Sequence, residues 1–258
     1  KETLEDFYFV NMGATAVGTG LNADTTYVKD IAAKLGEVTG MDFKQSTDLV
    51  DGTRNLDGFV WLSSALKVCA VNLSKMSNDL RLMASGPRAG FFEINLPQKQ
   101  PGSSIMPGKV NPVIPEVMNQ VSFQIFGNDL TITKAAEAGQ LELNVFEPVL
   151  FFNLFQSIQI LKNGVQTLNH NCIKGITPNV ARTEEVVKNS IGIITAINPH
   201  VGYKNAAEVA KESLKTGKTV RELTIEKGLL TNEELDVILD VYNMTNPGIS
   251  GKELMKKN

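Results

Sequence analysis

The longest regular pattern in the sequence runs from Leu56 to Met83, and it constrains the fold class most strongly. Apolar and small residues recur there at a spacing of about 3.5 residues, which is typical of a helix in a long bundle: Leu56, Phe59, Val60, Ser63, Leu66, Ala70, Leu73, Met76, Leu80 and Met83. A second pattern of this kind spans about Leu143 to His170 and contains Pro148 near its start. Because no strands alternate with these helices, we expect an all-α protein built on a helical bundle.

Shorter features surround the two long patterns. Asp24–Gly40 has helical periodicity and a glycine stop. Asn11–Asn22 is rich in glycine but matches neither phosphate-loop pattern, so we expect a tightly packed turn. Phe92–Leu96 alternates as a short strand does, and helix resumes after Pro112. Polar residues that interrupt the first long helix are expected to form hydrogen bonds within the bundle: Ser63, Asn72, Asn78 and Arg81.

The character of the chain changes near Gly175–Pro178. Shorter helical segments follow, at about residues 182–197, 203–216, 219–227, 231–241 and 251–257. Thr231 and Glu234 have the spacing of a helix-starting capping box. We therefore expect two domains: a partial central helical bundle over residues 1–174 and a small helical C-terminal domain over residues 175–258.

Composition excludes several classes of function. The chain has 258 residues, 42% of them hydrophobic, and a net charge of −3, which favours neither nucleic acid nor an anionic membrane as a partner. Cys69 and Cys172 have no metal or disulfide spacing, so we expect reduced thiols and a cytoplasmic protein. His170 and His200 lie in different expected domains without acidic or thiol partners at ligand spacing. We expect no metal and no cofactor.

The segment most suited to chemistry is Pro101–Pro112, PGSSIMPGKVNP. Its prolines and glycines exclude a regular helix, and such a backbone can direct several N–H groups toward an anion. Lys109 adds a positive charge and Asn111 adds amide donors, which together suit a carboxylate. A serine in the same surroundings could act as a base. From spacing alone, a substrate-binding loop and a structural loop both remain open.

Residues 102–112, GSSIMPGKVNP, resemble the signature of the aspartase/fumarase superfamily. The resemblance extends from NMGATAVGTGLN at residues 11–22, through LRLMASGPRAG at 80–90, to MTNPGISGKEL at 244–254. The form NPVIPEV at residues 111–117 is similar to the aspartase branch of the family rather than to fumarases.

This resemblance implies a role for each polar residue of the loop. Ser103 is the implied general base, which removes a proton from C3 of L-aspartate. Ser104 is implied to help hold the resulting aci-carboxylate, and Lys109 and Asn111 to bind the α-carboxylate. Ammonia then leaves and fumarate forms. Glu116 matches an acidic residue that in the family pairs with an active-site histidine.

The resemblance also implies an incomplete site. Family active sites combine motifs from three subunits of a homotetramer, and the two motifs that come earlier in a family chain are absent here. The chain therefore resembles the C-terminal half of a family member, the back part of the central bundle with the C-terminal domain, and we expect it to be inactive alone. Two alternatives stay open: a fumarate hydratase or other lyase of the superfamily, and a structural helical module for oligomerisation.

Overall fold

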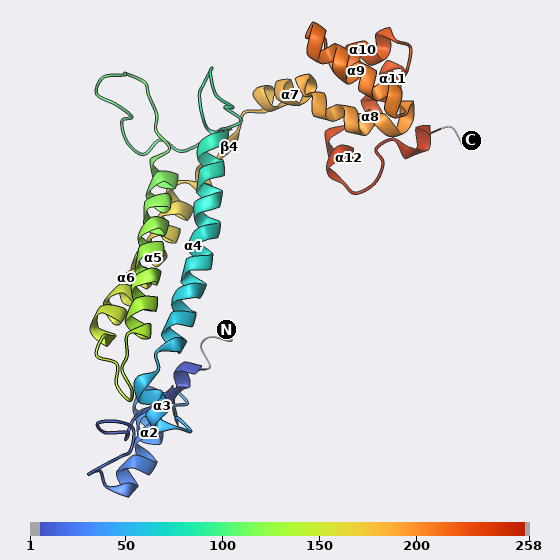
Figure 1. Cartoon of the computed structure of the whole chain (residues 1–258). Helices are drawn as coiled ribbons and strands as arrows, with labels where there is room; N and C mark the ends of the chain where they lie inside the picture. Colours follow the sequence, from blue (N-terminus) through green and yellow to red (C-terminus); the bar gives the residue numbers. More distant parts are fainter. Residues whose placement is uncertain (1–5, 256–258) are drawn as a thin grey trace. The chain divides into compact units, whose positions relative to one another are not determined.

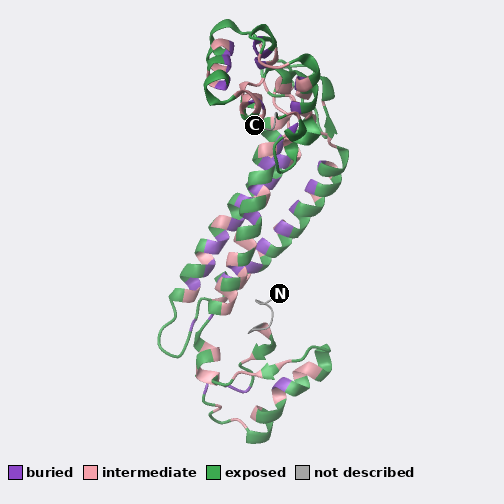
Figure 2. Ribbon diagram, turned by 90° about the vertical axis from the view of Figure 1, so that its right-hand side faces the viewer, coloured by how far each residue is buried: buried purple, intermediate pink, exposed green. Residues whose placement is uncertain are grey.

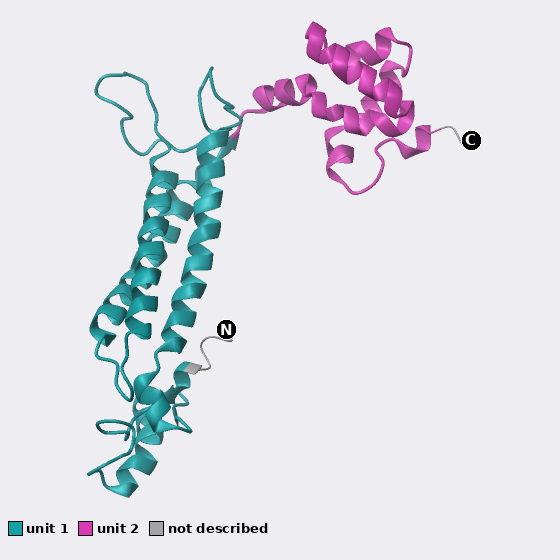
Figure 3. Cartoon of the chain, viewed as in Figure 1, with its two compact units in different colours: residues 1–177 teal, residues 178–258 magenta. Residues whose placement is uncertain are grey.

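The computed structural model describes residues 6–255, and its architecture is all-α (Figure 1). This confirms the fold class expected from the sequence. The chain forms two compact units, unit 1 over residues 1–177 and unit 2 over residues 178–258 (Figure 3). The division into domains after residue 174 stays a prediction, and each compact unit is described here by itself.

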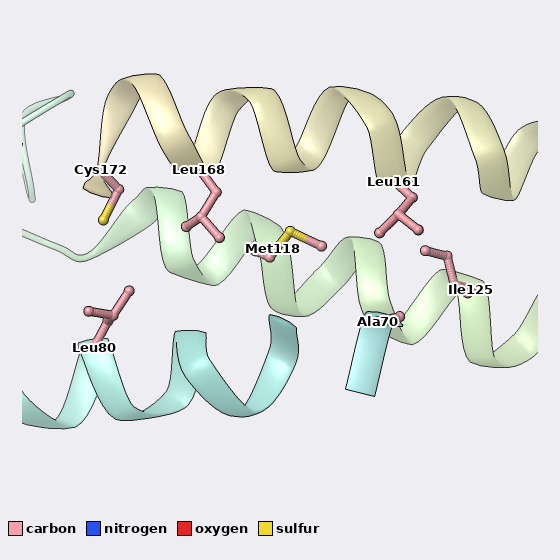
Figure 4. Packing of buried hydrophobic residues seen from close by; sticks show 7 residues of the cluster. All are labelled: Ala70, Leu80, Met118, Ile125, Leu161, Leu168 and Cys172. Carbon is pink, nitrogen blue, oxygen red and sulfur yellow. The ribbon is translucent and has the colours of Figure 1, made fainter. Parts of the chain in front are cut away.

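Unit 1 is dominated by the long helices α4 (Asp57–Met83), α5 (Val113–Glu137) and α6 (Glu147–Asn171), which pack side by side. Their shared core contains a cluster drawn in Figure 4, in which Leu161 and Leu168 of α6 are directed toward α5. The members of this cluster are Ala70, Leu80, Met118, Ile125, Leu161, Leu168 and Cys172. Each large apolar side chain buried in this way contributes about 1.5–3 kcal/mol.

Buried polar side chains tie the bundle helices together. Asp129 of α5 accepts hydrogen bonds from Ser63 Oγ (2.8 Å) and Lys67 Nζ (2.6 Å) of α4. Asn128 of α5 donates to Ser157 Oγ of α6 (3.0 Å). Asn119 of α5 donates to Ser74 Oγ of α4 (2.9 Å). These bonds satisfy groups whose burial alone is costly, and they confirm that Ser63 is a hydrogen bonder of the bundle.

The N-terminal part of unit 1 is a small assembly of short elements. Strands β1 (Phe9–Val10) and β2 (Lys44–Gln45) pair in parallel. They accompany η1 (Asp6–Tyr8), α2 (Thr25–Thr39) and α3 (Leu49–Arg54). Helix α2 begins at the cap Asp24 and ends at left-handed Gly40, as the sequence predicts. Helix α3 was not predicted, because six residues of mixed polarity carry little periodicity.

The glycine-rich segment Asn11–Asn22 is a series of close turns over α3. A Cβ on Gly18, whose φ is +89°, would lie 2.3 Å from Val50 Cα. Only glycine therefore fits this approach. The expectation of a tightly packed turn is confirmed.

A non-helical excursion connects α4 to α5. It contains β3 (Ile94–Asn95), which forms a two-stranded sheet with β4 (Thr177–Pro178). The predicted strand from Phe92 to Leu96 is too long, because Phe92 has a φ of +51°, outside the extended region. Helix α6 begins later than Leu143, since the Asn144 side chain accepts from Phe146 N–H and Pro148 occupies the first turn.

Unit 2 is built from short helices around one core. After η2 (Ile173–Gly175) of unit 1, its elements are α7 (Val180–Asn189), η3 (Ile191–Ile193), α8 (Ile194–Val201), α9 (Tyr203–Thr216), α10 (Val220–Glu226), α11 (Asn232–Ile238), α12 (Val241–Thr245) and η4 (Lys252–Leu254). The fully buried core residues are Ile197, Val209, Val220, Leu223, Leu235 and Ile238.

Helix boundaries in unit 2 correct several sequence-based expectations. The single segment at 182–197 is wrong, because extended Ser190 interrupts it and caps Gly192 N–H. The segment at 231–241 is also divided, since Asp240 caps a new helix at Val241. The capping box of Thr231 with Glu234 is confirmed, and a second box joins Thr219 to Glu222. The end of the expected segment 251–257 lies partly outside the described residues.

Large apolar side chains remain in solvent along the bundle helices, and Figure 2 shows exposed positions over their whole length. Val117 of α5 and Phe155 of α6 are exposed in this way, although Ile125, Leu154 and Leu161 are buried. None of the helices within residues 6–255 combines the length and apolar character that a membrane-spanning helix needs.

Candidate functional site

The signature loop Pro101–Pro112 is closed at its base by contacts across its two ends. Asn111 Nδ2 donates a hydrogen bond to the backbone oxygen of Gly102 (3.0 Å). A Cβ on Gly102 would lie 1.9 Å from the backbone oxygen of Lys109, so this position requires glycine. The two ends of the loop thus lie against each other, and residues 103–108 form a lobe between them.

Ser103 is the best-fixed serine of the lobe. Its Oγ accepts hydrogen bonds from the backbone N–H groups of Ile105 (3.1 Å) and Met106 (3.2 Å). The turn is completed by Lys109 N–H, which donates to the Met106 carbonyl (3.2 Å), and by Gly108 at a φ of +83°. Two backbone donors on one serine oxygen favour negative charge there. Ser104 is exposed, whereas Ser103 is half-buried.

A cavity of about 600 Å³ lies beside the returning end of the loop. Lys109 and Asn111 line it, together with Arg81, at the end of α4, and Gln98. The remaining lining residues are Ala84, Ser85, Gly86, Pro87, Phe92, Ile94, Asn95, Leu96, Gly108, Val110 and Pro112. The structure therefore brings Lys109 and Asn111 together at one cavity, whereas Ser103 and Ser104 are not among the described residues that line it.

Glu116 lies in the first turn of α5, where a carboxylate complements the helix dipole. It is half-buried, and its N–H donates to the Pro112 carbonyl (3.2 Å). Within residues 6–255 its carboxylate forms no hydrogen bond or ion pair with another side chain.

The histidines and cysteines have structural surroundings. His170 Nδ1 lies 2.9 Å from the Gln166 carbonyl, and His200 Nε2 lies 2.8 Å from the Ser250 carbonyl. Cys69 and Cys172 are free thiols, and burial raises the pKa of the Cys172 thiol. Across the described part of the chain, no three His, Cys, Asp or Glu residues gather as metal ligands do.

Arg81 is the cavity residue whose position the sequence did not reveal. The sequence predicts that it is a hydrogen bonder of the bundle, and this is confirmed, because its Nη1 donates to Asn119 Oδ1 (3.2 Å). Its place on the cavity depends on contact between α4 and residues 108–112, which no local pattern encodes. The available signal was its position four residues before the Ser85–Gly86–Pro87 turn, at the end of a long helix.

Comparisons with known proteins match both units. A family model described as lyase matches residues 1–127, and one described as fumarase C C-terminus matches residues 193–246. An aspartate ammonia-lyase from Bacillus sp. is 61% identical over 251 residues, which cover 97% of this chain and 54% of that relative. The chain belongs to the aspartase/fumarase superfamily. It spans about half the length of the curated relatives it matches.

Solved structures of this superfamily superpose closely. A fumarate lyase:delta crystallin from Brucella melitensis, bound to cobalt, gives a TM-score of 0.90 at 47% identity over 95% of this chain and 53% of that chain. A class II fumarase from Schistosoma mansoni gives a TM-score of 0.87 at 33% identity over 95% of this chain and 55% of that chain. The superfamily fold is thus shared with proteins named as a fumarate lyase and as a class II fumarase.

Proposed function

We propose that this chain forms part of an ammonia-lyase that converts L-aspartate to fumarate and ammonia. The observation that carries the proposal is the Ser103 oxygen held by two backbone N–H donors, on a loop whose returning end lines a cavity with Lys109 and Asn111. The identity of 61% to an aspartate ammonia-lyase from Bacillus sp. supports the choice of substrate.

In this proposal Ser103 is the general base. A serine hydroxyl is a weak acid, so its deprotonated form needs donors that are already in place. The N–H groups of Ile105 and Met106 provide two such donors. The alkoxide takes the C3 proton of L-aspartate, and the electron pair of the broken C–H bond moves into the adjacent carboxylate. Ser104, one residue along the exposed lobe, donates to this aci-carboxylate.

The electron pair then returns to form the C2–C3 double bond as the C2–N bond breaks and ammonia leaves. Lys109 and Asn111 hold the α-carboxylate during this step, because an ammonium and an amide at one cavity offer charge and directed donors. The Asn111 side chain already spans the base of the loop through Gly102. It therefore couples the carboxylate site to the shape of the lobe that carries Ser103.

The complete site requires further residues. Since the chain spans about half the length of its curated relatives, we propose that other segments supply the rest and that this chain alone is inactive. Glu116 would then pair with a histidine from such a segment. The exposed apolar residues of α4, α5 and α6 support assembly of several copies, and we propose a homotetramer. Free Cys69 and Cys172 suit a reducing cytoplasm.

An assay of the complete enzyme, meaning the protein that contains this chain, tests the proposed reaction. Ammonia release from L-aspartate and hydration of fumarate are measured side by side. We expect release of ammonia with negligible hydration. Hydration without ammonia release would instead support the fumarase alternative, in line with the 33% identity to a class II fumarase. Absence of both activities would support a structural module.

A further inference from the structure

The cavity beside the signature loop contains two positive side chains from distant parts of unit 1. Lys109 comes from the loop and Arg81 from the last turn of α4. No described residue that lines the cavity is acidic. Glu93 lies between the lining residues Phe92 and Ile94 in sequence but is not part of the lining itself. The positive charge at this cavity is therefore not neutralised by its own walls.

The Arg81 guanidinium is held by the bundle. Its Nη1 donates to Asn119 Oδ1, and Asn119 is only 4% exposed. The Asn119 amide is oriented in turn, because its Nδ2 donates to the backbone oxygen of Ser74 (3.1 Å) and to Ser74 Oγ (2.9 Å). With the amide nitrogen bonded to Ser74, the amide oxygen faces Arg81, two turns further along α4. One nitrogen of the exposed Arg81 guanidinium is thus anchored to a buried side chain of the bundle.

Most of the donors of Arg81 stay available. A guanidinium has five N–H donors in a planar fork that matches a carboxylate. The bond to Asn119 uses one of them, and within residues 6–255 the Arg81 side chain forms no ion pair and no second hydrogen bond. A cavity of about 600 Å³ is within the usual range for small-molecule sites.

We propose that Arg81 is a substrate-binding residue, whose guanidinium binds a carboxylate of a small dicarboxylate in this cavity together with Lys109. The inference rests on the proposed lyase function for the identity of the dicarboxylate. Asn119 is then a positioning residue, which acts on substrate only through Arg81. The site takes dianions in preference to monoanions, because the two cations that line this cavity are matched by two negative groups.

Binding of succinate, an unreactive four-carbon dicarboxylate, tests the proposal without any need for turnover. Calorimetric titration of the complete enzyme compares the parent with Arg81→Gln, Arg81→Lys and Arg88→Gln. The last is the matched control, since Arg88 is exposed on the neighbouring turn and does not line the cavity. We expect Arg81→Gln to weaken succinate binding at least tenfold, Arg81→Lys to weaken it less, and Arg88→Gln to change it less than twofold.

Equal succinate affinity in the parent and Arg81→Gln would overturn the proposal, as would an equal loss in Arg88→Gln. If Arg81→Gln does not fold by circular dichroism, Arg81→Lys decides: the fork is lost while the charge is kept, and unchanged affinity would sink the assignment. Failure of the proposed lyase function gives a different result from failure of the Arg81 proposal. If Ser103 is not the base, succinate still binds and Arg81→Gln still weakens that binding. If Arg81 does not bind substrate, succinate affinity is unchanged in Arg81→Gln, and proton transfer by Ser103 can still be measured at saturating aspartate.

Discussion

Unit 2 buries its apolar side chains in one small core, whereas the bundle of unit 1 leaves many of its largest ones in solvent. In unit 2 the residues of the core cluster are at most 1% exposed. In unit 1 Trp61, Phe152 and Phe155 are 65%, 65% and 62% exposed. Unit 2 has exposed aromatic residues too, at Tyr203 and Tyr242. The bundle differs in that its exposed residues follow one another along α4, α5 and α6.

This difference indicates two kinds of unit. A small domain with short helices around a closed core can be stable by itself. Helices α4, α5 and α6 keep large exposed apolar side chains, a surface that suits contact with other copies. The signature loop belongs to the unit of the second kind. A site on that unit is expected to be completed by its neighbours.

Separating the units gives the largest expected effect. Residues 178–258 alone should melt cooperatively as a monomer, because their core cluster lies wholly within that segment. Residues 1–177 alone should self-associate at micromolar concentration through their exposed apolar faces. Thermal circular dichroism and analytical ultracentrifugation measure both. A non-cooperative melt for residues 178–258 would show that unit 2 is not stable by itself. A stable monomer for residues 1–177 would show that the exposed apolar faces of unit 1 do not associate.

Truncation of single side chains compares how much a buried and an exposed apolar residue contribute to stability in the two units. Leu235→Ala in the core of unit 2 should cost about 2–5 kcal/mol, since it removes a fully buried side chain. Phe155→Ala on the bundle should cost less than about 1 kcal/mol in the unassembled chain, because the ring is mostly in solvent. Urea unfolding followed by circular dichroism provides the two values. Similar losses of unfolding free energy at the two positions would mean that Phe155 is packed against other residues and not exposed to solvent.

The dependence of the stability of unit 2 on acid pH is expected to be a smaller effect than either of these. Hydrogen bonds from the backbone N–H and hydroxyl of Thr219 lower the pKa of Glu222, and Lys227 lowers that of Glu212. Because the folded pKa lies below the unfolded value of about 4.3, this stability is present above that pH and is lost as the pH falls. In unit 1, hydrogen bonds from Thr26 lower the pKa of the Asp24 carboxyl.

Glu222→Gln tests this directly. The variant should flatten the decline in the unfolding midpoint of unit 2 between about pH 5 and pH 3, because its side chain no longer titrates. Glu208→Gln, at a glutamate that forms no hydrogen bond in the described chain, is the matched control and should leave the decline unchanged. The urea unfolding midpoints of the parent and both variants of residues 178–258 are measured across this pH range. Parallel curves for the parent and Glu222→Gln would contradict the assignment.

Local signals in the sequence were sufficient for much of the fold. The 3.5-residue repeat predicts α4 with its bounds, and Asp24 with Gly40 predicts both ends of α2. Periodicity could not separate the buried core from the exposed surface: Leu154 and Phe155 are neighbours in sequence and both apolar, yet one is buried and the other exposed. Which apolar face meets another helix of the same chain is a property of tertiary packing.

The part of the candidate site that lies within the signature loop could be predicted from the sequence. The residues from Ser103 to Asn111 lie within nine positions, so their motif can be seen in the sequence. Their roles belong to the proposed function. The position of Arg81 was out of reach, because the contact that brings it to Lys109 joins residues far apart in the chain. The two N–H donors on Ser103 also depend on the fold of the turn.

Replacement of Ser103, the proposed base of an aspartate-eliminating site, is the decisive experiment. Turnover of L-aspartate and binding of succinate are measured for the complete enzyme and its Ser103→Ala variant. We predict a loss in kcat of about 1,000-fold, in the range of general-base catalysis, with succinate affinity within threefold of the parent. Turnover within tenfold of the parent would exclude Ser103 as the general base.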